Sequence, residues 1–451
     1  MNIIKVVDAH CGAGKSSFAI QTINQSPDKR FIYCSPFLSE LKRIIGSTGS
    51  NRFHEPEFQI EDSKTHYKTH STKLESFHAL LRAHADIAST HSNFLNANEE
   101  TMALLKDAHY TLFLDEVLDV VQRFDAISSV ANCERQKTDE EDLVNLLNCG
   151  YIQIPPESGQ VQWTGNQWAQ FSELERLSNK GKVYCAKNSM LLNVFPPEIF
   201  SLFEEVYVFT YCFFGTPLRA YFDKYDIPYE VVSVERVDEE YRLTDYNAEA
   251  EYAFRQTVKS LISIYTGKTK YNNTALSRSW MEKASEKALK RLSAGAEYFF
   301  HTIARAKCKD AMWTCFAPFR KKLQPKGYVW TRWFNEAERG LKEAEKEKIN
   351  KKRSCFVPCN ARASNDYRDR RALAYMLNLY PPAELEAFFT CIGKRVSFSR
   401  DEYALQSLIQ WIFRSRIRDG KPIDLFLPSI RMQKLLIGWM DGVDLLKQAA
   451  A

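Results

Sequence analysis

The sequence predicts an α/β fold in which parallel sheets are covered by helices on both faces. Short β-branched and aromatic runs alternate with stretches that can form helices; the clearest runs are residues 3–7, 31–34, 110–114 and 206–211. Such alternation is typical of parallel sheets joined by crossover helices. Pro36 closes the second run, because proline has no amide hydrogen to give to a central ladder. With 451 residues, the chain has room for two or three domains.

The composition is that of an ordinary globular protein, with 45% apolar and 26% charged residues. No run of eighteen apolar residues occurs, so we expect no membrane span. The first seven residues are too short and too quickly polar for a signal peptide, which predicts a cytoplasmic protein, in the host cytoplasm if its source is viral. The eleven cysteines are scattered, and we expect reduced thiols rather than disulfides or a metal site.

The predicted elements form two domains. We expect residues 1–225 to form the first, interrupted by an insertion at about residues 131–200 that holds an acidic patch and a hairpin near residues 150–163. Residues 226–451 are expected to form a second α/β domain. Its predicted strands lie at residues 230–234, 311–316, 356–358 and 424–427, and a charge-rich helix or linker lies at 336–352.

A glycine-containing loop at residues 9–16 lies between the first predicted strand and a predicted helix. It fits the P-loop pattern, with Ala9 in place of the first glycine. Gly12 and Gly14 let the backbone approach phosphates, Lys15 reaches the β/γ-phosphates, and the Ser16 hydroxyl binds Mg²⁺. The alternative is a glycine-rich turn that happens to precede Lys-Ser. The residues expected to hold the nucleotide are Ala9, Gly12, Ala13, Gly14, Lys15, Ser16 and Ser17.

A P-loop needs a carboxylate for its magnesium. Asp115 ends the apolar run at residues 110–114, where a Walker B aspartate is expected, and Glu116 follows where it can polarise the attacking water. The alternative is a pair of acids that open a helix, since carboxylates are favoured at helix N-termini. With the phosphate loop on a neighbouring predicted strand, we favour Ser16 and Asp115 as metal ligands and Glu116 as a catalytic residue.

A basic group lies near the C-terminus. Residues 410–418 predict a helix with Gln410, Arg414 and Arg418 on one face, because residues four apart are neighbours on a helix. Such arginines can reach a γ-phosphate across a cleft, as an arginine finger does. The alternative is a basic helix with a solvated face.

A second basic stretch, residues 305–333, belongs to a chain whose formal net charge is +5. Interleaved aromatic residues and cations can stack bases and follow phosphates, but core aromatic residues beside a solvated basic face give the same composition. Both interpretations stay open. The aromatic residues are Trp313, Phe316, Phe319, Tyr328, Trp330 and Trp333.

Taken in order, these segments resemble the motifs of superfamily 2 helicases, in particular phage-type helicases related to the DEAD/DEAH group. Residues 9–16 resemble motif I, and Asp115-Glu116-Val117-Leu118 resembles the DExx form of motif II. Residues 410–418 resemble motif VI, although Phe413 replaces its glycine and Ile417 its last arginine. Residues 35–37, 90–92, 209–211 and 361–366 are similar to motifs Ia, Ib, III and V.

The resemblance implies two RecA-like P-loop domains that form an ATP-dependent helicase or translocase. ATP and Mg²⁺ are the implied cofactors, with Gln410, Arg414 and Arg418 on the wall opposite the phosphate loop. The implied partners are nucleic acid, DNA before RNA, and replication or recombination proteins, with no membrane contact.

Two other functions compete with this one. A viral DNA-packaging ATPase of the terminase type shares the P-loop and the Asp-Glu pair, but it should carry a C-terminal nuclease with carboxylates on strands. A nucleotide-gated nucleic-acid-binding protein that no longer unwinds anything would explain the irregular segment at residues 410–418.

Overall fold

The computed structural model describes residues 3–49, 52–57, 72–124, 139–186, 190–329, 354–360 and 365–445. The chain divides into two compact units: Met1–Asp245 with Pro381–Ser399, and Tyr246–Tyr380 with Arg400–Ala451. The first unit extends past residue 225, because the strands at Tyr229–Val237 and Glu240–Asp245 join its sheet. The segment at 230–234, which we expected to open the second domain, therefore belongs to the first.

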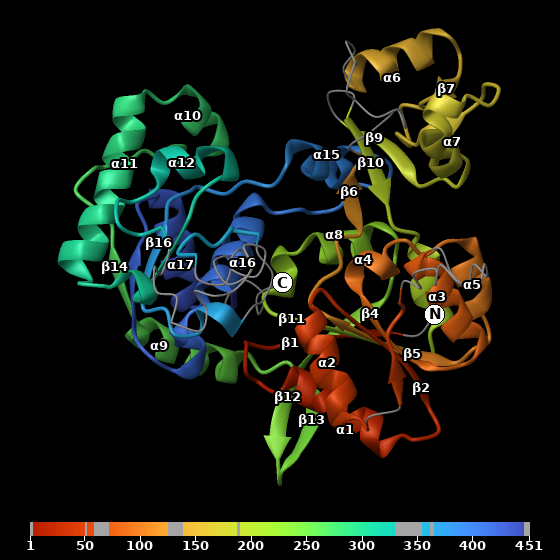
Figure 1. Ribbon diagram of the computed structural model, residues 1–451, viewed down its shortest axis with the longest axis horizontal. Helices are drawn as coiled ribbons and strands as arrows, with labels where there is room; N and C mark the ends of the chain where they lie inside the picture. The colour runs from red at the N-terminus through yellow and green to blue at the C-terminus, as the bar shows by residue number, and fades with distance from the viewer. Residues whose placement is uncertain are drawn as a thin grey trace, which may run out of the picture. The chain divides into compact units, whose positions relative to one another are not determined.

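The first unit is built on one large sheet (Figure 1). Its strands are β1 Ile4–Asp8, β2 Arg30–Ser35, β3 Phe53–His54, β4 Asp86–Thr90, β5 Tyr110–Asp115, β11 Glu205–Thr210, β12 Tyr229–Val237 and β13 Glu240–Asp245. Its helices outside the insertion are α1 Lys15–Gln25, α2 Leu38–Ser47, α3 Lys73–Arg82, α4 His91–Phe94, α5 Glu99–Leu105, α8 Pro217–Lys224 and α15 Ala383–Cys391.

The strand order of this sheet is β13-β12-β1-β11-β5-β2-β4-β3. Among the described strands of this sheet, every pairing is parallel except that of β12 with β13, which confirms the predicted parallel sheet. Strands β1 and β5 are not neighbours, contrary to our expectation, because β11 lies between them. The carboxyl ends of parallel strands share one edge, and ligands of open α/β sheets bind there.

Aromatic residues dominate the core beneath α1. The Phe113 ring stacks on that of Tyr207 with centroids 5.0 Å apart, and the Phe18 ring of α1 lies 5.8 Å from the same tyrosine. Phe18, Ala19 and Ile23 are buried on the helix face toward the sheet. This packing fixes the start of α1 against the end of β1.

The insertion between β5 and β11 has a hydrophobic core of its own. It holds β6 Val121–Arg123, α6 Asp139–Asn148, β7 Ile152–Gln153, β8 Gln162–Trp163, α7 Ser172–Asn179, β9 Val183–Ala186 and β10 Met190–Val194. Strands β7 and β8 pair antiparallel, which confirms the predicted hairpin, and β6, β10 and β9 form a small antiparallel sheet. Leu143, Leu146 and Leu174 are among the residues buried in the core of the insertion.

One segment from late in the sequence belongs to the first unit. Helix α15 lies beside β9 (Figure 1), where the Phe388 ring meets that of Tyr184 edge to face at 5.4 Å. The Lys224 ammonium of α8 lies 4.7 Å from the centroid of the Phe388 ring. The Lys224 Nζ also donates to the carbonyls of Ile392 and Lys394.

The second unit has a four-stranded sheet in the order β14-β17-β16-β15, with every pairing parallel. Its strands are β14 Ile262–Tyr265, β15 Ala311–Thr314, β16 Ala372–Tyr375 and β17 Ile423–Phe426. Its helices are α9 Ala248–Leu261, α10 Arg278–Lys283, α11 Glu286–Tyr298, α12 Arg320–Leu323, α16 Arg400–Ile412 and α17 Ile430–Met440. The predicted strands at 311–316 and 424–427 are confirmed.

The aromatic residues of the second basic stretch belong mainly to the core. Trp313, Phe319 and Tyr328 are buried, and the Trp313 Nε1 donates to the Tyr328 carbonyl at 2.8 Å. Core packing therefore accounts for these three rings. Trp330, Trp333, the predicted helix at 336–352 and residues 361–364 lie outside the described residues. Among the helices that the structure describes, none combines the length and apolar character needed to cross a membrane.

Candidate nucleotide-binding site

The phosphate loop links β1 directly to α1. Gly12 and Gly14 have φ values of 93° and 101°, a left-handed conformation that glycine adopts without a steric penalty. Gly14 is the N-cap of α1, and no side chain caps the helix. The first amides of α1 therefore lack a capping side chain, and such amides suit an anion.

Lys15 is the first residue of α1, and its ammonium turns back over the loop. The Nζ donates to the carbonyl oxygens of Ala9 and His10, the second at 3.0 Å. Ala9 is itself fixed, because its amide donates to the Thr210 carbonyl of β11 at 3.1 Å. The loop, the lysine and the strand beside it thus form one hydrogen-bonded assembly.

Strand β13 supports the loop from a distant part of the sequence. A Cβ added to Gly14 would lie 2.1 Å from the Tyr241 ring, so that ring packs directly against the loop. Gln21 of α1 holds Tyr241 by two bonds: its Oε1 accepts from the Tyr241 amide at 2.7 Å, and its Nε2 donates to the Tyr241 carbonyl at 3.1 Å. No sequence pattern indicated Gln21 or Tyr241 as part of this site.

Asp115 lies at the carboxyl end of β5, as predicted. The Ser35 hydroxyl, at the end of β2, donates to its Oδ2 at 3.0 Å. Burial raises the pKa of Asp115 to about 7, and the charges of Glu116 and Glu40 add to this rise. The Ser35 hydrogen bond and the Lys15 charge act in the opposite direction. A cation bound beside this carboxyl group would favour its ionised form and lower its pKa.

Glu116 has a strained backbone. Its φ of 69° is uncommon for a residue with a side chain, and such strain concentrates at functional sites. Its amide donates to the Phe209 carbonyl of β11 at 2.9 Å, one residue before the carbonyl that holds Ala9. Strand β11 therefore connects the phosphate loop on one side with Asp115 and Glu116 on the other.

The structure brings the predicted residues of the first unit together. Lys15 is close enough for its charge to lower the pKa of Asp115. Ser16 and Asp115 both lie near the buried Tyr33. Burial raises the pKa of that tyrosine most, the Asp115 charge raises it further, and Ser16 lowers it. A hydroxyl, a carboxylate and open amides are the donors that a magnesium-bound triphosphate uses. These residues fit ATP and Mg²⁺.

The described residues contain no group of three or more His, Cys, Asp or Glu side chains that could hold a metal ion. The acids after residue 366 do not form a cluster on strands: most of them lie on helices, Asp369 lies in a turn, and Asp424 lies on β17. Glu384 and Glu386 belong to α15, and Asp401 and Glu402 belong to α16. The structure gives no support to the packaging-ATPase alternative.

The predicted helix at residues 410–418 is wrong in its second half. Helix α16 ends at Ile412, because the Ser415 hydroxyl donates to the Ile412 carbonyl at 2.7 Å and then caps a 3₁₀ helix at Arg416–Asp419. Short polar side chains compete with helix bonds in this way. Gln410, Arg414 and Arg418 therefore do not share one helix face.

The arginines of this segment have different surroundings. Arg414 is only 5% exposed and lies near Tyr375, where its charge opposes the rise of the tyrosine pKa that burial causes. Arg418 is half-buried beside Asp419. The Asp419 pKa is lowered first by its bond to Arg368 and further by Arg418.

The fold is similar to that of solved helicases of the XPD type. One XPD helicase structure has a TM-score of 0.51 with 12% identity, over 99% of this chain and 95% of that chain. An XPD apo structure has a TM-score of 0.53 with 14% identity, over 98% and 95% of the two chains. The predicted fold class, two RecA-like units with parallel sheets and an insertion in the first, is confirmed.

The sequence comparison points to a prophage protein. Residues 256–440 match the family described as the YonV C-terminal Rossmann-like domain. Over 454 aligned positions, the chain is 30% identical to the SPbeta prophage-derived uncharacterized protein YonV of Bacillus subtilis (strain 168), covering 98% of this chain and all of that protein. The chain belongs to the family of the prophage protein YonV.

Proposed function

We propose that this protein is an ATP-dependent nucleic-acid helicase or translocase, acting on DNA in preference to RNA. The observation that carries the proposal is the meeting of Lys15, Ser16 and Asp115 at one edge of the large sheet, with Glu116 beside them. The helicase-like fold supports the same class of function.

Each residue has a role that follows from its position. The Lys15 ammonium can exchange the carbonyls of Ala9 and His10 for phosphate oxygens. The backbone at Gly12 and at Gly14 can approach those oxygens closely, since neither glycine carries a side chain. Mg²⁺, held by Ser16 and Asp115, would neutralise charge on the phosphates. Glu116 would orient the attacking water from its strained position at the end of β5.

The second unit would contribute positive charge. We assign Arg418 as the first candidate for the finger, since its side chain is only half-buried. Arg414 is buried near Tyr375 and suits a supporting role better. Gln410 lies on the last turn of α16, four residues before Arg414.

The test combines duplex unwinding with ATP turnover. The full-length chain, Lys15→Ala and the matched control Lys42→Ala, an exposed lysine of α2, are compared on a duplex with a single-stranded tail. We expect the wild type and Lys42→Ala to displace the strand only with ATP, and Lys15→Ala to lose both activities. Unwinding that survives Lys15→Ala would rule the proposal out.

A nucleotide-gated binding protein is the second candidate, and the early end of α16 favours it. If the arginines cannot complete the site, ATP would bind without turnover. In that case ATP would tighten the affinity for single-stranded DNA, while hydrolysis by the wild type would equal that of Glu116→Gln.

A further inference from the structure

Positive charge is concentrated in one segment of the second unit. Residues 266–329 contain fourteen lysines and arginines and four acids, a formal charge of +10. The whole chain carries +5, so the other residues are together acidic. The segment follows β14 and includes α10, α11, β15 and α12. A charge asymmetry of this size within one chain indicates an anionic partner for the basic part.

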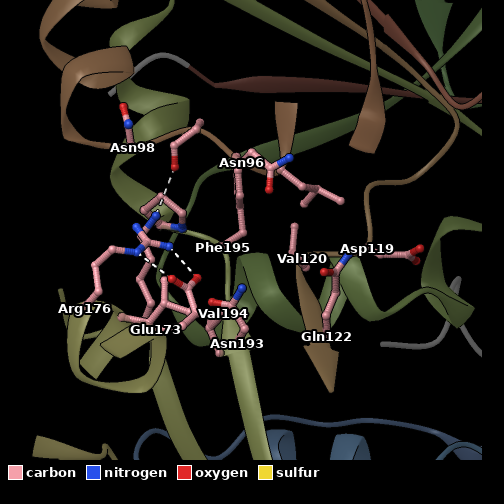
Figure 2. Close-up of a pocket in the computed structure, with 15 residues that line it drawn as sticks. Asn96, Asn98, Asp119, Val120, Gln122, Glu173, Arg176, Asn193, Val194 and Phe195 are labelled. Carbon is pink, nitrogen blue, oxygen red and sulfur yellow. Dashed lines mark hydrogen bonds and ion pairs between the residues drawn. The ribbon is translucent and has the colours of Figure 1, made fainter. Parts of the chain in front are cut away.

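The cations of this segment are exposed and mostly without a neighbouring carboxylate. Thirteen of the fourteen are exposed, and Arg320 is half-buried. Within the part of the chain that the structure describes, Arg278 is the one of them that forms an ion pair, with Glu282. The exposed Arg176 of the insertion differs: beside the small pocket that Figure 2 shows, it is bound to Glu173 by bonds of 2.8 and 2.6 Å. Cations without such a partner keep their attraction for an external anion.

Two helices present six of these cations together. Helices α11 and α12 lie side by side (Figure 1), and the Ser293 hydroxyl of α11 donates to the Gln324 carbonyl, just after α12, at 3.1 Å. Leu289 and Leu292 of α11 and Leu323 of α12 are buried. The exposed cations on these helices and on the turn after α12 are Lys287, Lys290, Arg291, Lys321, Lys322 and Lys326. We call these six residues the α11–α12 basic face.

The spacing along α11 places its three cations on one side of the helix. Lys287 is three residues before Lys290 and four before Arg291, and residues at these separations are neighbours on a helix surface. Lys290 is in turn three residues before Ser293, the residue that contacts the segment after α12. Lys290 therefore lies on the side of α11 toward α12 and connects the two groups of cations.

The chemistry of this face suits phosphates better than a protein or a membrane. Protein–protein contact surfaces are depleted in lysine, and a helix that lies on a membrane needs a free apolar side. The apolar side of α11 is already buried inside the unit through Leu289 and Leu292. Residues 311–329 contain no acid that would repel a phosphate. Lysine and arginine are the side chains that neutralise the phosphates of a nucleic acid, whatever its sequence.

We infer that the α11–α12 basic face binds the phosphate backbone of a nucleic-acid strand. The inference rests on the proposed nucleic-acid function and places part of the strand on the second unit. Because the six side chains include no aromatic ring and no amide, the face holds the strand without reading its bases.

The test is the salt dependence of single-strand binding, measured by fluorescence anisotropy with the full chain and labelled oligo-dT. Two variants each remove three charges: Lys287→Gln/Lys290→Gln/Arg291→Gln, the α11 variant, and Lys321→Gln/Lys322→Gln/Lys326→Gln, the α12 variant. Each lost phosphate contact removes about 0.7 from the slope of log affinity against log salt, so we expect each variant to lower the slope by about 2. At about 50 mM salt we expect an affinity loss of at least about tenfold, equal for oligo-dT and oligo-dA.

The matched control is Lys42→Gln/Lys106→Gln/Lys434→Gln, which removes the same charge from three exposed lysines outside the face. It weakens the long-range field without removing a contact, so it should keep the wild-type slope. Basal ATP turnover without a strand should be the same in all four proteins. The strand concentration that gives half-maximal stimulation of turnover should rise about tenfold in the α11 variant and stay unchanged in the control.

A wild-type slope in either face variant, or a control that loses as much slope as they do, would overturn the inference. So would wild-type binding to phosphatidylserine vesicles that the α11 variant loses while it keeps its affinity for oligo-dT, because the face would then bind a membrane. If the wild type binds oligo-dT and is stimulated by it in these cases, the face alone is wrong. If the wild type binds no strand, the proposed function fails together with the inference.

Discussion

Two glycines of the phosphate loop share a left-handed backbone but differ in what surrounds them. Gly12 has open space where a Cβ would lie, whereas a Cβ on Gly14 would meet the Tyr241 ring at 2.1 Å. Both substitutions by alanine carry backbone strain, and only Gly14→Ala adds overpacking. We expect Gly14→Ala to lower the free energy of unfolding by about 1–3 kcal/mol more than Gly12→Ala.

Urea unfolding of the two variants measures this difference. Tyr241→Ala in the Gly14→Ala background should recover part of the loss, because it removes the ring that the new methyl group strikes. Equal losses in Gly12→Ala and Gly14→Ala would show that β13 does not press on the loop.

The site residues of the first unit divide into those that the sequence could predict and those that it could not. Local patterns predict Lys15 and Asp115. Lys15 ends a glycine-containing loop between a predicted strand and a predicted helix, and Asp115 comes at the end of an apolar run. Gln21 and Tyr241 are 220 residues apart, and only the sheet order brings them together. No local sequence pattern indicates that Gln21 and Tyr241 are in contact, and only the structure shows it.

At the scale of elements, the contact of α8 with α15 contains a buried lysine. Burial lowers the pKa of Lys224 to about 8 from an ordinary value near 10.5. Between these two pH values the unfolded chain binds more protons than the folded chain, so stability rises with pH. Relative to Lys224→Met, the wild type should gain up to about 3 kcal/mol between pH 8 and 10.5.

Chemical unfolding of both proteins across this range checks the prediction, since the variant lacks only this titration. A difference in unfolding free energy that stays constant with pH would mean that Lys224 is not destabilised by its burial.

The segment at residues 410–418 shows how an element can be misjudged from spacing alone. The four-residue spacing of Gln410, Arg414 and Arg418 suggested one helix, and Ser415 ended it. Because Arg414 is buried and Arg418 is half-buried, we expect Arg414→Ala to lower the stability by more than 2 kcal/mol and Arg418→Ala by less than 1 kcal/mol.

Thermal unfolding of Arg414→Ala and Arg418→Ala measures the difference in stability. ATP turnover by Arg418→Lys then tests Arg418 as the arginine finger, because lysine keeps the positive charge. If Arg418→Ala unfolds as readily as Arg414→Ala, Arg418 is structural as well.

At the scale of the whole molecule, the chain returns to the first unit through Pro381–Ser399. A fragment of residues 1–245 would lack α15 and the carbonyls that bind Lys224. We expect the fragment to melt several degrees below its complex with a peptide of residues 381–399, since binding to the folded state raises its stability. Circular dichroism with and without the peptide measures the shift, and no shift would show that α15 is dispensable.

The fold class followed from the alternation of strands and helices, but the boundary between units did not. Strand β12 looks like the start of a second α/β domain because nothing in its sequence reveals its pairing with β1. The return of α15 is equally invisible, since its contacts with Tyr184 and Lys224 join residues far apart in the chain. Long-range pairing, rather than local propensity, determines both the boundary between the units and the position of α15.

The most direct measurement is steady-state ATP turnover with and without single-stranded DNA, for the wild type and Glu116→Gln. We expect the single strand to stimulate the wild type severalfold, and Glu116→Gln to bind ATP but turn it over at least about 100-fold more slowly. Turnover that ignores the single strand, or that survives Glu116→Gln, would contradict a nucleic-acid motor at this site.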